Sequence, residues 1–385
     1  MELIAPCHFG TEAVLKREIY RLGYEITRVE NGRVFFEGDA EAVCRANIGL
    51  RTAERILWKV GDFTATSFEE LFQGIRAIPW EEYLPRDARF WVTKAASVRS
   101  ALFSPSDIQS VAKKAMVERM KSVWKLERFP ETGEEYPVRI FLMNDEVTVT
   151  LDTTGTSLHK RGYRTLAGEA PISETLAAAL IGLTPWHPDR ILADPFCGSG
   201  TFLIEAARMA AHIAPGIDRS FTAERWTNLI PPEEWKSVRS EMRSLETPDV
   251  STDLQGFDID DDVIRVARAN ARAAGVDHLI HFQTRDVRDF SHSGKYGFLL
   301  TNPPYGERLE EKEDLPPLYR ALGEAYRRLD SWSLYVVTSY EDAQRYIGKK
   351  ADRNRKLYNG MIRTYFYQYA GPKPPKRGGR KNAEE

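Results

Sequence analysis

The sequence predicts an α/β protein in which a doubly wound parallel sheet begins near residue 171 and follows a smaller α+β region. Beyond residue 171, short apolar runs alternate with segments of helical periodicity, which is the pattern of βαβ units. Before residue 65, strand and helix signals follow the order β-α-β-β-α-β of a ferredoxin-like module. Four predicted strands of the later region end in polar residues, which indicates a ligand site at one edge of its sheet.

The composition is that of a globular protein of two or three domains. The chain has 385 residues, of which 29% are charged and 42% are hydrophobic. It contains no apolar run near the ~20 residues that span a membrane, and residues 1–6 lack the features of a signal peptide. Cys7, Cys44 and Cys197 lie far apart without metal-ligand spacing. We therefore expect free thiols, no metal and a cytoplasmic location.

The N-terminal region divides into two predicted modules, at 1–65 and 66–156. In the first, Asn31-Gly32 predicts a hairpin turn. The remaining signals of this module are strands at 3–5, 34–36 and 55–60 and helices at 11–19 and 40–48. The second module has helices at 68–76 and 107–125 and strands at 90–96, 138–143 and 146–151. By itself, the second pattern predicts only a small α+β domain.

The rest of the chain divides into a linker at 157–170, the parallel-sheet domain at 171–371 and a basic flexible tail at 372–385. Leucines at helical spacing predict a helix at 315–329. Asn359-Gly360 predicts a hairpin between the two final strands. Residues 212–252 separate the first helix of the domain from its next strand. Such a segment either caps the active site or extends the surface, and we expect the second.

A glycine-containing turn follows the first strand of the parallel-sheet domain. The strand at 191–193 leads into Asp194, and Gly198-Ser199-Gly200 precedes an apolar helix. Glycines let a backbone approach a ligand closely, and a helix start offers unpaired N–H groups. The turn lacks the third glycine of a dinucleotide site and the Gly-Lys-Ser/Thr of a P-loop. Because Asp194 would repel a pyrophosphate and attract an ammonium group, we expect a cofactor with an amino-acid moiety.

The next two strands also end in acidic residues. Asp258 ends the strand at 254–257 and suits ribose hydroxyls, and Asp286 follows the strand at 280–284 and suits an adenine amine. Each aspartate alone is explained as well by a helix cap. Ligands of open α/β sheets bind outside the carboxyl ends of strands, so the three aspartates together predict the cofactor site.

A fourth strand ends in Asn302-Pro303-Pro304-Tyr305. Proline lacks a backbone N–H and restricts the residue before it, so the strand stops there and leaves carbonyls without ladder partners. An amide oxygen, a carbonyl and an aromatic ring together suit a flat heterocycle with an exocyclic amine. We therefore expect chemistry on the amine of a nucleobase, although the same residues also form ordinary turns.

Paired motifs carry a specific resemblance over nearly the whole chain. Asp194-Pro-Phe-Cys-Gly-Ser-Gly-Thr201 and Thr301-Asn-Pro-Pro-Tyr-Gly-Glu-Arg308 resemble those of S-adenosylmethionine-dependent RNA methyltransferases with a THUMP domain, above all the bacterial 23S ribosomal RNA guanine-N2 group. Leu158-His-Lys-Arg-Gly-Tyr-Arg164 and Ala170-Pro-Ile-Ser-Glu-Thr-Leu-Ala177 resemble the entry into its catalytic domain.

The resemblance implies a class I methyltransferase fold, a doubly wound seven-stranded sheet whose last strand is antiparallel, and it makes residues 66–156 the THUMP domain. It also implies S-adenosyl-L-methionine as cofactor, 23S rRNA as substrate and no obligate protein partner. The implied cofactor contacts are Asp194, Phe196, Gly198, Gly200, Thr201, Asp258 and Asp286, and the implied catalytic residues are Asn302, Pro303 and Tyr305.

Basic residues gather locally although the net charge is only −2. Our candidate RNA contacts are Lys94, Arg99, Lys113, Lys160, Arg161 and Arg164. A solvated surface, or a salt-bridge network between domains, explains such clusters as well. Four other functions stay open: tRNA guanine-N2 methylation, RNA adenine-N6 methylation, methylation of a protein glutamine, and a non-catalytic RNA-binding assembly factor.

Overall fold

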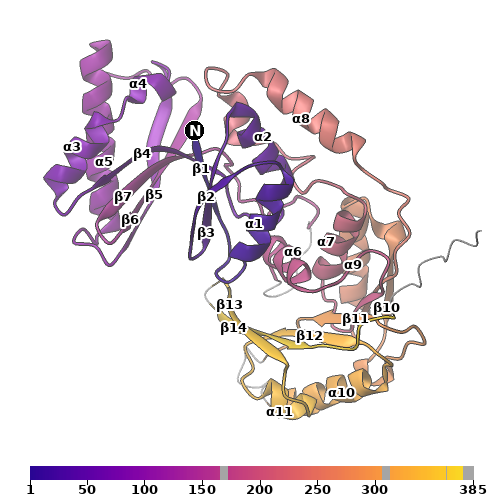
Figure 1. Cartoon of the computed structure of the whole chain (residues 1–385). Coiled ribbons are helices and arrows are strands. Elements are labelled where there is room, and N and C mark those ends of the chain that lie inside the picture. Colours follow the sequence, from indigo (N-terminus) through magenta and orange to yellow (C-terminus); the bar gives the residue numbers. More distant parts are fainter. Residues whose placement is uncertain (165–171, 306–312, 361, 376–385) are drawn as a thin grey trace, which may run out of the picture. The chain divides into compact units, whose positions relative to one another are not determined.

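The protein forms two compact units, as seen in a computed structural model that describes residues 1–164, 172–305, 313–360 and 362–375 (Figure 1). The first unit comprises Met1–Gly162 and Ile213–Glu246. The second comprises Tyr163–His212 and the chain from Thr247 onward. The sequence of the second unit is therefore interrupted by a segment that folds with the first.

The elements of the first unit are β1 (Glu2–Pro6), α1 (Glu12–Arg21), β2 (Ile26–Glu30), β3 (Arg33–Glu37), α2 (Ala40–Gly49), β4 (Leu57–Thr64), α3 (Phe68–Ala77), α4 (Trp80–Tyr83), β5 (Arg89–Val98), α5 (Pro105–Trp124), β6 (Glu135–Met143), β7 (Glu146–Asp152), η1 (Thr222–Arg225) and α8 (Pro232–Ser244). Those of the second are α6 (Glu174–Leu183), β8 (Leu192–Asp194), α7 (Thr201–Ala210), β9 (Leu254–Asp258), α9 (Asp261–Ala273), η2 (Asp277–Leu279), β10 (Ile280–Thr284), η3 (Val287–Asp289), β11 (Phe298–Thr301), α10 (Leu315–Arg328), β12 (Ser333–Thr338), α11 (Ala343–Ile347), β13 (Arg353–Asn359) and β14 (Ile362–Tyr369).

One seven-stranded sheet, in the order β2-β3-β1-β4-β7-β6-β5, carries the first unit. Its first four strands pair antiparallel in the order expected of a ferredoxin-like module. The sheet continues because β4 also pairs antiparallel with β7. β4 ends at Thr64, so both predicted N-terminal modules contribute to one sheet, and their boundary at residue 65 stays a prediction.

The second unit has the predicted doubly wound sheet, in the order β10-β9-β8-β11-β12-β14-β13. The pairs from β10 to β12 are parallel, and β14 is antiparallel to both of its neighbours. Figure 1 shows α6, α7 and α9 on one side of this sheet and α10 and α11 on the other. The α/β fold class and the antiparallel last strand are thus confirmed.

The segment at 213–246 corrects one expectation. Its tryptophans are buried in the first unit, with Trp226 0% and Trp235 3% exposed. The Trp226 ring stacks on Tyr136 with centroids 4.9 Å apart, and its Nε1 donates to the Glu135 carbonyl at 2.8 Å. Figure 1 shows α8 beside α2, and Arg45 of α2 is ion-paired with Glu241 of α8. The expected surface extension was wrong, because these large rings complete a hydrophobic core.

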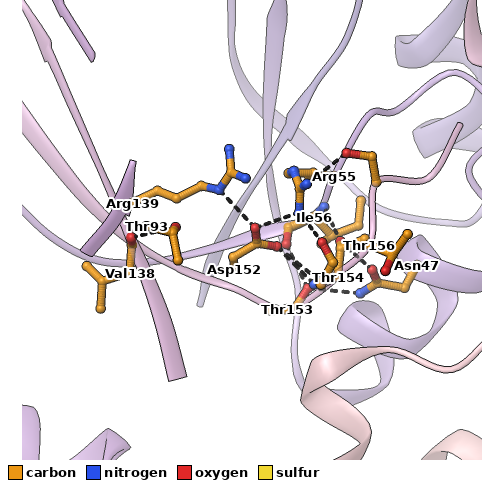
Figure 2. A network of polar contacts seen from close by, with 12 residues as sticks. Asn47, Arg55, Ile56, Thr93, Val138, Arg139, Asp152, Thr153, Thr154 and Thr156 are labelled. Carbon is orange, nitrogen blue, oxygen red and sulfur yellow. Dashed lines mark hydrogen bonds and ion pairs between the residues drawn. The ribbon is translucent and has the colours of Figure 1, made fainter. Parts of the chain in front are cut away.

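A buried polar network lies where β7 ends (Figure 2). Asp152 accepts hydrogen bonds from Arg55 at 2.7 Å and from Arg139 at 2.8 Å. The same carboxylate accepts from the backbone N–H of Thr154 at 3.1 Å, and Asn47 of α2 donates to Thr153 Oγ1 at 2.9 Å. One carboxylate therefore neutralises Arg139 of β6 and Arg55, which precedes β4, and holds the chain as it leaves the sheet.

Removal of this carboxylate should destabilise the first unit. The Asp152 side chain is 3% exposed, so Asp152→Ala would leave two poorly solvated guanidinium groups without their shared anion. We expect a loss of about 3 kcal/mol in the free energy of unfolding, measured by urea denaturation. The control is Asp62→Ala, whose carboxylate also pairs with a lysine but is 66% exposed and should cost less than about 1 kcal/mol. Equal losses in the two variants would contradict the role assigned to Asp152.

Candidate active site

The candidate site lies at the carboxyl ends of β8, β9, β10 and β11. β8 pairs with β9 on one side and with β11 on the other, and the order of strands along the chain reverses between β8 and β11. Open α/β sheets bind ligands at such a switch point. The sheet therefore brings the predicted cofactor turn and the predicted base-binding loop to adjacent strand ends.

Asp194 connects these two strand ends. Its Oδ1 accepts a hydrogen bond from Thr301 Oγ1 of β11 at 2.6 Å and another from the Phe196 backbone N–H at 3.1 Å. The side chain is 2% exposed. Burial raises the pKa of Asp194 from 3.8 to about 7, the two hydrogen bonds oppose this shift, and the nearby Asp258 adds to it.

The glycine turn after β8 has the open backbone expected of a ligand-binding turn. Gly198 and Gly200 have φ values of +52° and +84°, which side-chain-bearing residues rarely adopt. A Cβ on Gly198 would meet no atom within 4 Å, so space for a ligand lies beside this residue. Asn270 of α9 donates to the Ser199 carbonyl at 3.1 Å and supports the turn from behind.

Asp258 at the end of β9 also contacts the turn. Its Oδ2 accepts from the Gly198 backbone N–H at 3.1 Å, and its Oδ1 accepts from the Asp260 N–H at 3.2 Å. Burial raises the pKa of Asp258, and the hydrogen bonds from Asp260 and Gly198 counteract this. Two carboxylates with raised pKa values therefore border one open turn, an arrangement that suits a cationic ligand with hydroxyl groups.

Asp286 has a different environment. Its carboxylate caps η3 by accepting from the Arg288 backbone N–H at 2.8 Å, and it is ion-paired with the Arg288 guanidinium at 2.5 Å. The hydrogen bond to that side chain lowers the pKa of Asp286. The structure thus shows Asp286 as the helix cap that the sequence analysis gave as the alternative to a ligand contact. The adenine contact stays a prediction.

Thr201, another predicted cofactor residue, is held by contacts within the protein. It is buried at the first position of α7, and its Oγ1 accepts from Arg164 at 2.7 Å. Arg164 also donates to the Ile172 carbonyl at 2.9 Å and lies 3.5 Å from a Glu174 oxygen. The guanidinium of Arg164 therefore supports the start of α7, and we replace its predicted RNA contact by this structural role.

The loop after β11 presents the predicted catalytic residues. Asn302 and Tyr305 are half-buried and Pro303 is buried. The Pro304 carbonyl accepts a hydrogen bond from the hydroxyl of Tyr319 in α10 at 3.1 Å. Within the described part of the chain, neither the Asn302 amide nor the Pro303 carbonyl has a hydrogen-bond partner. Residues 306–308 of the motif lie outside the described residues.

The other basic candidates differ in exposure. Arg161 is 5% exposed and donates to the carbonyls of Leu158 at 2.8 Å and Arg51 at 2.5 Å, so it too is structural and its predicted RNA contact is corrected. Lys113 donates to the Phe90 carbonyl and lies 3.7 Å from that ring centroid, and burial lowers the pKa of this lysine. The accessible candidates are Lys94, Arg99 and Lys160, which are all exposed.

The sequence did not indicate several residues that support the site. Thr301 begins one of the quoted motifs but was given no role, and Asn270 lay in no helix for which the sequence analysis gave a range. Tyr319 was hidden in the leucine stripe of its helix, one residue after Leu318. Within the described ranges, no cluster of three or more His, Cys, Asp or Glu residues has a metal-binding arrangement, and no helix is long and apolar enough to cross a membrane.

Three sequence families match consecutive parts of the chain. The "RlmL ferredoxin-like domain" matches residues 2–57, the "THUMP domain" residues 65–152 and the "RMKL-like, methyltransferase domain" residues 161–368. The last match alone covers more than half of the chain.

Two relatives extend over the full sequence. The chain is 46% identical over 383 residues to "Putative RNA methyltransferase YpsC" of Bacillus subtilis (strain 168), with 99% of each protein covered. It is 33% identical over 389 residues to "Ribosomal RNA large subunit methyltransferase K/L" of Cellvibrio japonicus (strain Ueda107). That alignment covers 96% of this chain and 51% of the relative, so the chain spans about half of the larger protein.

Two solved structures of similar proteins superpose on nearly the whole chain. SMU.472, "a putative methyltransferase complexed with SAH", superposes with a TM-score of 0.91 at 42% identity, covering 97% of this chain and 99% of the other. A "predicted N6-adenine-specific DNA methylase" from Listeria monocytogenes str. 4b F2365 superposes with a TM-score of 0.90 at 47% identity, covering 96% of each chain.

The raised pKa of Asp194 predicts a pH-dependent stability. The carboxyl has a pKa of about 7 in the folded protein and 3.8 in the unfolded chain, so its contribution is fully present below pH 3.8 and is lost as the pH rises through 7. Asp194→Asn keeps an oxygen acceptor but cannot ionise. The stability of this variant relative to the native protein should therefore rise by about 2 kcal/mol between pH 5.5 and pH 8, measured by urea denaturation of the ligand-free proteins. A difference that does not change with pH would show that Asp194 is ionised throughout.

Proposed function

The chain belongs to the THUMP-domain family of S-adenosylmethionine-dependent RNA methyltransferases, and we propose that it methylates the exocyclic N2 of a guanine in 23S ribosomal RNA. The observation that carries the proposal is the pairing of the glycine turn with the Asn-Pro-Pro-Tyr loop at adjacent strand ends, joined by the Asp194–Thr301 hydrogen bond. The 23S assignment is supported by the large-subunit relative and by the resemblance of the paired motifs.

The described residues suit S-adenosylmethionine. Gly198 and Gly200 allow close approach of the backbone, Phe196 and Thr201 flank the turn, and Asp194 suits the ammonium group. Asp258 and Asp286, at the ends of the next two strands, are assigned to the ribose hydroxyls and the adenine amine. When bound, this cofactor supplies an electrophilic methyl group on a sulfonium.

The loop after β11 is assigned to the acceptor amine. The lone pair of a guanine amine is delocalised into the ring, which makes the nitrogen a poor nucleophile. Asn302 Oδ1 and the Pro303 carbonyl accept its two N–H protons in hydrogen bonds and favour a tetrahedral nitrogen whose lone pair faces the methyl group. Methyl transfer would be an in-line displacement in which the amine nitrogen gains the methyl group and the sulfonium keeps the electron pair of its C–S bond. Asn302 and Pro303 would orient the amine, which would then release one proton to water.

The base must leave a helical stack, or already be unpaired, to reach this loop. Stacking on Tyr305 stabilises the extruded base by ~1–3 kcal/mol. The sequence-independent part of RNA binding is assigned to exposed cations of the first unit. Lys94 lies on β5 and Arg99 directly follows it, and neither has an acidic partner among the described residues.

A second candidate keeps the chemistry and changes the base to adenine, methylated at N6. Asn302 and Pro303 would accept the two protons of that amine equally well, and the Listeria structure is named for this activity on DNA. Methylation of tRNA remains the alternative substrate for guanine-N2 transfer.

Mass spectrometry of nucleosides from a strain that lacks the gene tests the proposal. 23S rRNA and tRNA are separated before digestion, and the expected result is loss of N2-methylguanosine from the 23S fraction only. Loss of N2-methylguanosine from the tRNA fraction would instead make tRNA the substrate. Loss of N6-methyladenosine would make adenine the methylated base. No change in any methylated nucleoside would reject the proposal and direct attention to protein glutamine or a non-catalytic role.

Two substitutions should separate turnover from cofactor binding. Asn302→Ala should lower kcat by about a hundredfold and leave the cofactor Kd within about twofold, because only the amine loses an acceptor. Asp258→Ala should weaken cofactor binding by about tenfold or more, since its carboxylate supports the turn and is assigned to the ribose. Calorimetry with S-adenosylmethionine and a methyl-transfer assay measure the two effects. The matched control Asp262→Ala removes an exposed aspartate of α9 and should change neither kcat nor the cofactor Kd. If Asn302→Ala impaired kcat and cofactor binding equally, Asn302 would have a structural role.

The exposed cations should contribute to RNA binding through phosphate contacts. Lys94→Glu and Arg99→Glu should each weaken binding and reduce the slope of log Kd against log salt concentration by about 1. Lys121→Glu on α5 is the control, because it alters a cation of the same unit that lies near Glu118. Slopes identical to that of the native protein would remove Lys94 and Arg99 from the interface.

A further inference from the structure

A chain of hydrogen bonds leads from β12 to the loop that carries Asn302. The Tyr340 backbone N–H donates to Thr338 Oγ1 at 3.0 Å, and Thr338 Oγ1 lies 2.5 Å from the Tyr319 hydroxyl. That hydroxyl lies 3.1 Å from the Pro304 carbonyl oxygen. Thr338 ends β12, which pairs with β11, and Tyr319 lies in the second turn of α10. The side chains of Thr338 and Tyr319 are fully buried.

Donor and acceptor chemistry fixes the direction of every bond in this chain. A carbonyl oxygen only accepts, so the one proton of Tyr319 points to Pro304. The Tyr319 oxygen must then accept from Thr338, because it has no second proton to give. The Thr338 oxygen also accepts from the Tyr340 N–H, and this bond leaves the hydroxyl proton of Thr338 available for Tyr319. Each hydroxyl has one satisfied orientation, and the buried side chains leave little room for another.

These hydrogen bonds reach the Asn-Pro-Pro-Tyr loop at the Pro304 carbonyl. The peptide group between Pro304 and Tyr305 is planar, and the proline ring fixes φ, so holding this oxygen restricts the start of Tyr305. Of two consecutive proline carbonyls, one is thus bonded to the protein. The other, that of Pro303, has no hydrogen-bond partner in the described part of the chain.

We propose that Tyr319 and Thr338 are positioning residues for methyl transfer: they hold the Pro304 carbonyl so that the Pro303 carbonyl and the Tyr305 ring face the substrate amine and base. The inference rests on the role proposed above for the Asn-Pro-Pro-Tyr loop and adds two residues outside both sequence motifs. Because small displacements of groups that align reactants reduce turnover steeply, the effect should appear in kcat. Among the described residues, no hydrogen bond links the glycine turn after β8 to Tyr319 or Thr338, so cofactor affinity should be unchanged.

Tyr319→Phe tests the proposal, because it removes one hydroxyl and keeps the ring. We expect kcat to fall by about tenfold, with the RNA KM and the cofactor Kd within about twofold of the native values. The matched control is Tyr369→Phe. Tyr369 is equally buried in the same hydrophobic cluster, but its hydroxyl has no hydrogen-bond partner among the described residues, so its kcat should stay native.

Substitutions at Thr338 keep the test valid if a change in α10 affects folding. Thr338→Val replaces the hydroxyl by a methyl group and should reduce kcat as Tyr319→Phe does, whereas Thr338→Ser keeps the hydroxyl and should restore most of it. Because both residues act through one chain, the double variant Tyr319→Phe/Thr338→Val should be no slower than the slower single variant by more than about twofold.

Methyl transfer is followed as total incorporation of label from S-adenosylmethionine into RNA of the deletion strain, and the labelled nucleoside is identified afterwards. Label in a base other than guanine rejects the guanine assignment. The ratio of variant to native kcat still tests whether Tyr319 and Thr338 position the loop. A native kcat in Tyr319→Phe, or multiplied losses in the double variant, would overturn the proposal. So would a loss of kcat that is matched by equal weakening of cofactor binding, since that result indicates a general structural defect.

Discussion

The hydrogen bond from Thr301 to Asp194 is the contact on which the arrangement of the site depends. Its donor ends β11 and its acceptor ends β8, and the same carboxylate oxygen also accepts from the Phe196 N–H of the glycine turn. Adjacent strands of a parallel sheet have a fixed register, here with Phe298 opposite Leu192. The glycine turn and the Asn-Pro-Pro-Tyr loop are therefore placed by neighbouring strands, and their separation does not depend on the flexibility of either loop.

The electrostatics of the site follow from burial. Asp194 and Asp258 lie close enough for their charges to interact, and burial raises both pKa values. A buried carboxylate beside a half-buried one is unfavourable without a cation, so a positively charged ligand offsets a cost that the fold carries in its absence. Asp286 differs, because Arg288 already neutralises it and lowers its pKa. Aspartates at equivalent strand ends thus have distinct electrostatic states.

The first unit depends on residues from the middle of the methyltransferase sequence. Trp226 fills its core, stacks on Tyr136 and donates to the backbone at the start of β6. Trp235 packs its ring on Phe221 with centroids 5.6 Å apart. A chain that ended before residue 213 would expose the apolar surface that these rings cover. The hydrophobic core of the unit that carries Lys94 is therefore completed by a segment that interrupts the second unit.

The sequence by itself determined the α/β class of the second unit and several of its strands, because periodicity and turn residues are local. Strand β12, helix α9 and the order of the strands in the sheet were not among its predictions. Asn359-Gly360 marked the hairpin of β13 and β14, and the leucines at 315, 322 and 329 marked the buried face of α10. The placement of Asp194, Asp258 and Asn302 at neighbouring strand ends also followed from the sequence, since parallel strands bring their carboxyl ends to one edge. That part of the site required only that the strands be parallel.

Only the tertiary structure decided which polar side chains face inward and what they contact. Arg161 and Arg164 belong to a basic cluster in the sequence, yet protein oxygens surround their guanidinium groups. Trp226 lies in a segment without a clear pattern, and its partner Tyr136 is 90 residues earlier in the chain. The bond from Tyr319 to Pro304 requires a helix to pack on a loop 15 residues before it. Such contacts depend on packing between elements distant in sequence, which composition and periodicity do not encode.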